Sequence, residues 1–390
     1  MSSQHPTRRN FCQTLTAGAV GLTLAETTLT AANEWLLYIG TYTNAPSQSE
    51  GIYVYRFNAA TGELKPSSIA KSNASPAFLA IDAKRRFLYA ANEVGEFNGQ
   101  KNGGVTAFAI DQKTGELKQL NQQHAPGVPA HIAVHPSGKF VLIADYGGGN
   151  AAIYPVKQDG SLSAASDVAQ HTGKGGDPKR QTEPHAHSVV LDAAGQYAFV
   201  PDLGLDKIMI YRVDLLLGKL LPHGSVALKP ASGPRHFVFH PNGEFAYVIN
   251  EINSTVTAFE YIAARGTLTE MQSITTLPTD FKGTSYCADI HIHPTGKFLY
   301  GSNRGHNSIV IYALDKKTGK LTLVGHEPVG GDWPRNFNLD PTGQFLLVAN
   351  QRSNNIVVFR LNLKTGELTA TGQTLALDAP VCLQFIPAFS

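Results

Sequence analysis

The sequence predicts an all-β protein, a seven-bladed β-propeller with four antiparallel strands in each blade. Three observations lead to this fold class. A Gly-x-Leu hairpin motif occurs seven times, its leucines lie 45 to 58 residues apart, and each interval contains short apolar runs separated by turn residues. A period of about fifty residues built from short strands is typical of propeller blades. The leucines are Leu64, Leu117, Leu162, Leu220, Leu268, Leu321 and Leu368.

Each repeat has the same order of predicted strands. A first apolar strand leads into a turn of the His/Asp-Pro-x-Gly kind; four of the six turns have both the proline and the glycine, which favour a tight reversal. A second strand follows, as in Phe87-Leu-Tyr-Ala-Ala, and ends at Asn or Asp. A third, alternating strand and the Gly-x-Leu hairpin then lead to a fourth strand. The six turns begin at Asp82, His135, Asp192, His240, His293 and Asp340.

Six turns for seven hairpins indicate that one blade is assembled from both ends of the chain. Residues 378–386 have the pattern of a first strand, whereas residues 35–42 and 51–57 have the patterns of a second and a third strand. We therefore expect the N- and C-terminal strands to pair and close the ring, which leaves no exposed edge. Six blades with an appendage is the alternative. A closed repeat array is one domain, so residues 33–390 are expected to form a single propeller domain.

The first 32 residues have the pattern of a twin-arginine export signal. Arg8 and Arg9 precede an apolar stretch at residues 15–25, and Ala31 and Ala32 stand before the first strand. Such signals direct folded bacterial proteins across the inner membrane. The sequence thus predicts a periplasmic protein with no membrane attachment after the signal is removed. The alternative is a tail with a chance arginine pair, and then a cytoplasmic protein.

Composition excludes several classes of partner. The formal net charge is +2 and no polybasic run is present, which argues against a nucleic-acid partner. The three cysteines, Cys12, Cys287 and Cys382, are too few and too scattered for a disulfide framework or a zinc site. We expect a monomer that needs no cofactor and whose partner is a small molecule.

Strand geometry sorts the candidate functional residues. In a propeller the first strand of each blade lines the channel, and the start of this strand lies on the same rim as the end of the second strand. His135, His240 and His293 belong to the turns on the opposite rim, so we expect them to be structural. Nine ionisable residues fall on the first rim: His131, His187, His236, Asp289, Glu93, Glu251, Arg235, Arg304 and Arg335.

So many ionisable groups around one opening need partners or a ligand. One interpretation is a ring of ion pairs that holds the blades together. The other, which we favour, is a binding site for an anionic ligand, because arginine forks suit carboxylate and phosphate groups. Glu251 and His187 could transfer protons in such a site.

Two further features lie near His187. His185 and His187 alternate in an extended segment and could form a metal pair, but no third ligand follows from spacing, so we predict a site without metal. The basic, glycine-rich loop at residues 171–184 precedes them on the same rim. It could fold over a ligand, or it could be an ordinary solvated loop.

Five strings are similar to those of a known family: Tyr38-Ile-Gly-Thr-Tyr-Thr, Glu183-Pro-His-Ala-His-Ser, Gly233-Pro-Arg-His-Phe, Asn250-Glu251 and Ser302-Asn-Arg304. Over residues 35–390 the chain resembles the seven-bladed lactonase family, which holds propeller-type 6-phosphogluconolactonases and fungal carboxy-cis,cis-muconate lactonizing enzymes. In the lactonizing branch the proposed active-site set is a histidine, two arginines and a glutamate without metal. The matching positions are His187, Arg235, Arg304 and Glu251.

The resemblance implies hydrolysis of a small anionic sugar or organic-acid lactone, of the 6-phosphogluconolactonase type. His187, Arg235, Glu251 and Arg304 would be catalytic, and the remaining rim residues would bind substrate. Two alternatives remain, a carboxymuconate-type lactonizing cyclase at the same site and a non-catalytic periplasmic propeller that binds a ligand. Because phosphogluconolactone is made in the cytosol, an exported protein would act on another lactone.

Overall fold

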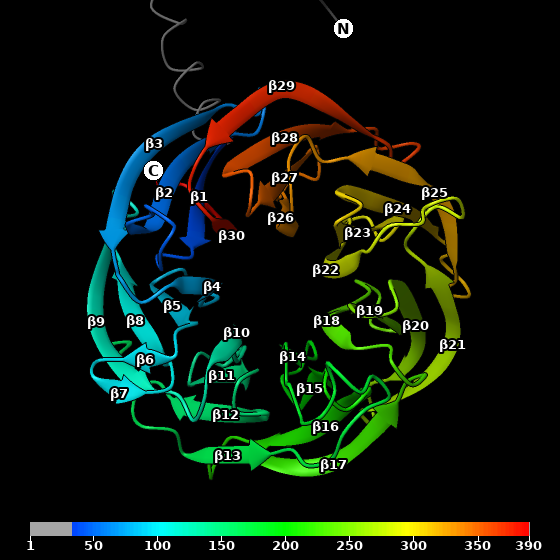
Figure 1. Cartoon of the computed structure of the whole chain (residues 1–390). Helices are drawn as coiled ribbons and strands as arrows, with labels where there is room; N and C mark the ends of the chain where they lie inside the picture. Colours follow the sequence, from blue (N-terminus) through cyan, green and yellow to red (C-terminus); the bar gives the residue numbers. More distant parts are fainter. Residues whose placement is uncertain (1–32, 390) are drawn as a thin grey trace, which may run out of the picture.

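The computed structural model describes residues 33–389, which form a ring of seven four-stranded antiparallel sheets around a central opening (Figure 1). The prediction of a seven-bladed β-propeller is therefore confirmed. The predicted export signal at residues 1–32 lies outside the described residues. Within the described residues, no helix is long and apolar enough to cross a membrane.

Blades 1 to 3 follow one another along the chain, each running from the channel to the outside of the ring. They contain β4 (Pro76–Ile81), β5 (Phe87–Asn92), β8 (Gly104–Ile110) and β9 (Leu117–His124); β10 (Pro129–Val134), β11 (Phe140–Asp145), β12 (Asn150–Pro155) and β13 (Asp167–Gln170); and β14 (Val190–Leu191), β15 (Tyr197–Asp202), β16 (Lys207–Asp214) and β17 (Lys219–Ala227). A small hairpin, β6 (Glu96–Phe97) with β7 (Gln100–Lys101), is inserted between β5 and β8.

Blades 4 to 6 repeat this order. They contain β18 (Pro234–Phe239), β19 (Phe245–Asn250), β20 (Thr255–Ile262) and β21 (Thr267–Thr275); β22 (Tyr286–Ile292), β23 (Phe298–Arg304), β24 (Ser308–Leu314) and β25 (Leu321–Pro328); and β26 (Pro334–Leu339), β27 (Phe345–Asn350), β28 (Asn355–Leu361) and β29 (Leu368–Ala376).

Blade 7 is built from both ends of the chain, as the sequence predicts. Its sheet order is β3 (Leu64–Lys71), β2 (Gly51–Asn58), β1 (Glu34–Thr41) and β30 (Pro380–Pro387). The C-terminal β30 lies on the channel side and pairs antiparallel with β1, for example Leu37 with Phe385. In Figure 1 the red β30 accordingly lies beside the blue β1. This pairing closes the ring, because it replaces two free sheet edges by one ladder of backbone hydrogen bonds.

Hydrophobic side chains fill the spaces between blades. Seven clusters of buried residues occur among residues 33–389, one at each junction of neighbouring blades. At the closing junction, Leu37 and Ile39 of β1 pack with Phe345 and Val358 of blade 6. Each sheet is therefore covered on both faces, which explains why the second strands are continuous apolar runs.

The turn histidines join consecutive blades, in agreement with the structural role predicted for them. Each is buried, and its Nε2 donates a hydrogen bond to the carbonyl of the turn glycine in the next blade. The pairs are His135 with Gly195 at 2.8 Å, His240 with Gly296 at 2.9 Å and His293 with Gly343 at 2.9 Å.

A second set of bonds links tyrosines of second strands to the Gly-x-Leu hairpins. In four blades the hydroxyl donates to the glycine carbonyl of the next blade's hairpin: Tyr38 to Gly115, Tyr89 to Gly160, Tyr247 to Gly319 and Tyr300 to Gly366, at 2.8 to 3.0 Å. The hairpin glycine, which recurs in every blade, is thus bonded to a tyrosine across the blade boundary in four of the seven hairpins.

The first strand of blade 3 is shorter than the sequence predicts. β14 has only two residues, although His187 N still donates to Pro201 O at 2.9 Å and Ala186 forms an isolated bridge with Asp202. Pro201 lies in β15, where its carbonyl faces this inner segment. The N–H of the same residue would face the same neighbour, and proline has none. The ladder is therefore interrupted beside His187.

Replacing Tyr247 by Phe should lower the free energy of unfolding by about 1 to 3 kcal/mol, because the Gly319 carbonyl loses its buried donor. Chemical denaturation measures this change. Tyr53→Phe is the matched control, since its hydroxyl only accepts a bond from the exposed Glu50 N–H. Equal stability losses in the two variants would show that the bond between blades contributes nothing specific.

Candidate active site

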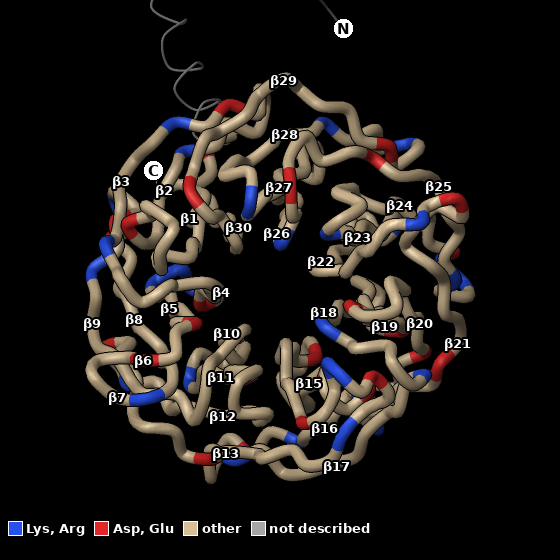
Figure 2. The backbone as a smooth tube through the Cα atoms, viewed as in Figure 1, with Lys and Arg blue, Asp and Glu red and all other residues tan. Residues whose placement is uncertain are grey.

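The inner strands carry a β-bulge that brings side chains to one rim of the channel. The register between β18 and β19 shifts between Pro234 and His236, so Arg235 is the bulged residue. Arg335 occupies the same position in blade 6, between Pro334 and Asn336. A bulge redirects the side chain of its extra residue. Figure 2 shows basic residues in β18 and in β26, beside the central opening.

Glu251 is the centre of the charged cluster on this rim. It follows the end of β19, is only 5 % exposed, and binds three guanidinium groups. Its Oε2 accepts from Arg235 Nε at 3.0 Å and Arg304 Nη2 at 2.7 Å, and its Oε1 accepts from Arg180 Nη2 at 2.7 Å. Burial alone would favour the neutral acid, but Arg304, Arg235 and Arg180 outweigh it and lower the pKa of Glu251 to about 2.

Arg235 and Arg304 are held rigidly beside this carboxylate. Arg235 also donates from Nη1 to the carbonyl of Ala288 at 2.6 Å. Arg304 donates from Nη2 to the carbonyl of Cys287 at 2.8 Å. Burial and the nearby Arg304 and Arg335 lower the pKa of Arg235 to about 9, so Arg235 keeps its charge at neutral pH. These bonds fix the orientation of both guanidinium groups before any ligand binds.

Below Arg235, His236 and Asp289 continue the network into the channel. His236 Nδ1 donates to Asp289 Oδ1 at 2.7 Å, and His236 Nε2 accepts from Arg235 Nη1 at 3.1 Å. This assignment requires a neutral ring. Burial and the Arg235 charge lower the pKa of His236 to about 4, in agreement with a neutral ring at pH 7. The other oxygen of Asp289 binds His291 Nε2 at 3.0 Å and Asn336 Nδ2.

His187 and His131 lie around His236. The His187 ring is 5.4 Å from that of His236, and the His131 ring is 5.6 Å from it, both edge to face. His187 Nδ1 is buried and has no hydrogen-bond partner within residues 33–389. Burial, Arg235 and His236 lower the pKa of His187 well below its usual value, so its ring is neutral and has a lone pair available.

Glu93 and Arg335 complete the rim near blade 7. Arg335 Nη2 lies 3.4 Å from Glu93 Oε1, and the Tyr42 hydroxyl donates to Glu93 Oε2 at 2.6 Å. The Arg335 guanidinium also lies 5.2 Å from the centre of the Tyr42 ring. The two rim glutamates, Glu93 and Glu251, thus hold arginines in place.

The structure therefore brings the nine predicted rim residues to one end of the channel. Contacts join Glu251, Arg235 and Arg304 directly, and His236 connects them to Asp289, His187 and His131. Arg335 and Glu93 form a second pair, and the positive charge of Arg335 acts on Arg235 and His187. Which of these residues act on a substrate remains a prediction.

Sequence reasoning did not single out Arg180, Tyr146 or Trp333. Arg180 comes from the basic loop at residues 171–184 and supplies the third cation on Glu251. The Tyr146 ring stacks on His185 at 4.4 Å and meets His187 edge to face at 5.4 Å. Arg304 lies 5.2 Å from the centre of the Trp333 ring. The basic composition of the loop pointed toward Arg180, and the count along the repeat places Tyr146 directly after a second strand, as it does Glu251.

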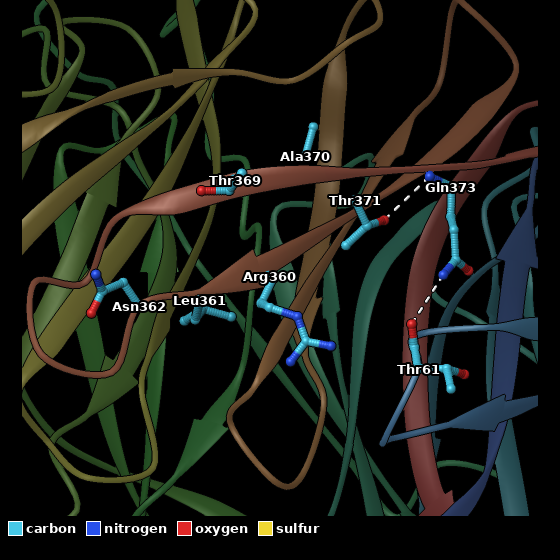
Figure 3. A pocket seen from close by; sticks show the side chains of 8 residues that line it. All are labelled: Thr61, Arg360, Leu361, Asn362, Thr369, Ala370, Thr371 and Gln373. Carbon is cyan, nitrogen blue, oxygen red and sulfur yellow. Dashed lines mark hydrogen bonds between the residues drawn. The ribbon is translucent and has the colours of Figure 1, made fainter.

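Of two hollows in the structure, one is lined in part by rim residues and the other is not. A cavity of about 300 Å³ lies inside the channel, and Phe78, His131, His236, Asp289 and His291 are among its lining residues. A second hollow of about 600 Å³ lies at the outer strands of blades 6 and 7 (Figure 3). Its lining is mostly uncharged and shares no residue with the channel cavity. Three of the nine rim residues, His131, His236 and Asp289, line the channel cavity, and none of the nine lines the outer hollow.

A metal pair at His185 and His187 gains no support. His185 Nδ1 donates to the Tyr146 carbonyl at 3.0 Å, so this nitrogen is already used. Across the described part of the chain, no group of three or more His, Cys, Asp or Glu side chains is arranged to hold a metal ion.

The ring of seven blades with a charged rim defines the class of protein, and comparison with known proteins then gives the family. Residues 36–385 match the family described as "Lactonase, 7-bladed beta-propeller". The chain therefore belongs to the seven-bladed lactonase family.

Curated relatives and a solved structure cover most of the chain. It is 36 % identical over 305 residues to 6-phosphogluconolactonase of Bacillus subtilis, which covers 78 % of this chain and 84 % of the relative. It is 39 % identical over 308 residues to 6-phosphogluconolactonase of Formosa agariphila, covering 77 % and 85 %. The structure of periplasmic gluconolactonase from Pseudomonas aeruginosa is similar with a TM-score of 0.85 and 33 % identity, covering 91 % of this chain and 99 % of that one.

The depressed pKa of Glu251 predicts a specific loss of stability in acid. Because the folded-state pKa is about 2 and the ordinary value is 4.5, the stabilisation is present above pH 4.5 and is lost as the pH falls toward 2. The free-energy difference between wild type and Glu251→Gln should shrink by about 3 kcal/mol from pH 7 to pH 2. Chemical denaturation across this range measures it, and a difference independent of pH would contradict the assigned ion pairs.

Proposed function

We propose that this protein is a lactonase that hydrolyses a small anionic sugar or organic-acid lactone at the charged rim. The family and the curated relatives named 6-phosphogluconolactonase support lactone hydrolysis. One observation at the site carries the choice of an anionic ligand. Four guanidiniums face two carboxylates, Glu251 and Glu93, so the rim retains positive charge even if Asp289 is counted.

The preorganised arginines suit the charge that develops during hydrolysis. Attack of water on the lactone carbonyl produces a tetrahedral oxyanion. Fixed donors such as Arg235 and Arg304 stabilise this charge without reorganising, because their bonds to Glu251 and to backbone carbonyls already orient them. In this proposal Glu251 acts as their counter-ion, since a carboxylate bound by three guanidiniums is a poor base.

His187 is the side chain best suited to accept the proton of the attacking water. It is neutral, and because its Nδ1 is buried away from solvent, Nε2 would be the nitrogen that takes the proton. Part of the reduction of its pKa comes from Arg235 and Arg335. An anionic ligand beside these arginines would offset their charge and raise the pKa of His187 toward the range of an effective general base.

The remaining rim residues would bind and orient the substrate. Asp289 holds the ring of His236, so that His236 can accept from Arg235 and keep its fork in place. His131, Arg335 and Glu93 would contact the substrate around the opening. The relatives' names favour hydrolysis over lactonization of a carboxymuconate, and over a propeller that only binds a ligand.

Replacing His187 by Gln should lower kcat by about 100- to 10,000-fold, the usual contribution of a positioned general base. The melting temperature should change little, because the substitution breaks no assigned side-chain bond. A pH-stat assay with sugar lactones measures turnover, and His223→Gln is the control because His223 lies at the exposed outer strand β17. Wild-type turnover in His187→Gln would refute this assignment.

We also propose that the protein is exported by the twin-arginine route and acts as a periplasmic monomer, without nucleic acid or a membrane anchor. The arginine pair at Arg8 and Arg9 supports this proposal, as does similarity to a gluconolactonase described as periplasmic. In the periplasm the lactone would be one other than cytosolic phosphogluconolactone.

Replacing both Arg8 and Arg9 by Lys should leave the protein in the cytoplasm, because twin-arginine signals depend on this pair. Cell fractionation followed by immunoblotting measures the distribution. Lysine keeps the positive charge, so a change in location reports the arginines and not the net charge. Unaltered recovery of the variant from the periplasm would exclude this export route.

A further inference from the structure

We propose that Arg180 is a specificity-determining residue, which binds the anionic substituent of the lactone and selects charged lactones over neutral ones. This inference rests on the proposed function and adds to it the part of the site that recognises the substituent. Three features of the loop at residues 171–184 carry it: how the loop is anchored, where it places Arg180, and how exposed that side chain is.

Asp202 fastens both ends of the loop. Its Oδ2 binds His171 Nδ1 at 2.5 Å, at the start of the loop, and its Oδ1 accepts from the His185 N–H at 2.8 Å, just after the end. The side chains of His171 and Asp202 are both fully buried. A loop closed by one buried carboxylate has a fixed base, in contrast to an ordinary solvated loop.

A second carboxylate fastens the middle of the loop, next to Arg180. Gln181 is 1 % exposed, and its Nε2 donates to Asp206 Oδ1 at 2.6 Å and to the Leu203 carbonyl at 2.7 Å. Asp206 Oδ2 also accepts from the Gly176 N–H at 2.9 Å. The backbone on either side of Arg180 is therefore fixed by buried hydrogen bonds, and these bonds determine the position of Arg180 beside the rim.

Arg180 differs from the other cations of the cluster in its exposure. Its side chain is 36 % exposed, whereas those of Arg235 and Arg304 are 2 % and 6 % exposed. Its Nη2 binds Glu251 Oε1, and its guanidinium lies 5.7 Å from the centre of the Tyr286 ring. A guanidinium has five N–H donors, so donors remain for a ligand while the bond to Glu251 persists.

The buried and the exposed arginines would bind different parts of the lactone. Arg235 and Arg304 are buried and would meet the reacting carbonyl, whereas the partly exposed Arg180 would be reached by the distant end of the lactone. A planar fork at that point can bind a phosphate or a carboxylate through two N–H groups. Neutral lactones offer no acceptor of this strength, so only charged lactones gain from Arg180.

The test compares three six-carbon sugar lactones: one neutral, one with a phosphate and one with a second carboxylate. In Arg180→Gln, kcat/KM should fall by about 10- to 100-fold for whichever charged lactone the site accepts, and by less than about threefold for the neutral one. The phosphate and carboxylate arms show which substituent is used. Lys179→Gln is the matched control, since it removes the same charge from an exposed neighbour on the same loop.

Calorimetry with 6-phosphogluconate and gluconate separates this inference from the proposed function, because it needs no turnover. The inference expects wild type to bind the phosphorylated acid more tightly, and expects Arg180→Gln to lose that preference. If wild type hydrolyses no lactone but keeps a preference that depends on Arg180, the proposed function fails and the inference stands.

Two outcomes would overturn the role of Arg180. An equal loss of kcat/KM for neutral and charged lactones would mean that Arg180 acts only through Glu251. Unchanged selectivity in both turnover and binding would mean that it contacts no substituent. Arg180→Lys provides a second variant with the charge retained, and it should recover part of the selectivity while losing the two-pronged contact.

Discussion

Closure of the ring is the constraint on which the site depends. Pairing of β30 with β1 fixes seven sheets around one axis, and each junction is then filled by a hydrophobic cluster. Since the sheets are covered on both faces, no blade can rotate without opening two clusters at once. The inner strands are consequently held at fixed distances from the axis. Residues far apart along the chain, such as Glu93 and Arg335 at a separation of 242 positions, therefore meet at the same opening.

The rim shows how a cluster of buried charges can be stable and still keep a net positive charge. Burying one guanidinium without a partner would be strongly unfavourable. Glu251 is the counter-ion of three arginines, and their positive charges in turn stabilise its carboxylate. The result is a set of oriented donors whose positive charge is not fully neutralised. Such preorganisation favours an oxyanion more than it favours a neutral ground state.

The local sequence pattern was sufficient to predict the architecture, because the same motifs recur with a period of about fifty residues. The Gly-x-Leu hairpin recurs in all seven blades, and a turn that begins with His or Asp recurs in six of them. The predicted terminal strands at residues 35–42, 51–57 and 378–386 agree with β1, β2 and β30 within a few residues. Blade 3 departs from the prediction since Pro201 lacks the N–H that the inner strand needs. The cause lies in β15 and not in the inner strand, so the sequence of the inner strand alone does not predict the shortening.

Counting along the repeat also located the nine rim residues, because strand alternation assigns each position to one end of the channel. It did not identify which groups are joined. That Glu251 serves as a shared counter-ion, that His236 is a neutral link between Asp289 and Arg235, and that Arg180 reaches Glu251 all follow from contacts between blades and a loop. The sequence by itself determined the ring and the rim, since both depend on local periodicity. Only the tertiary structure decided the pairing of charges, because partners in different blades are related by space and have no fixed spacing along the chain.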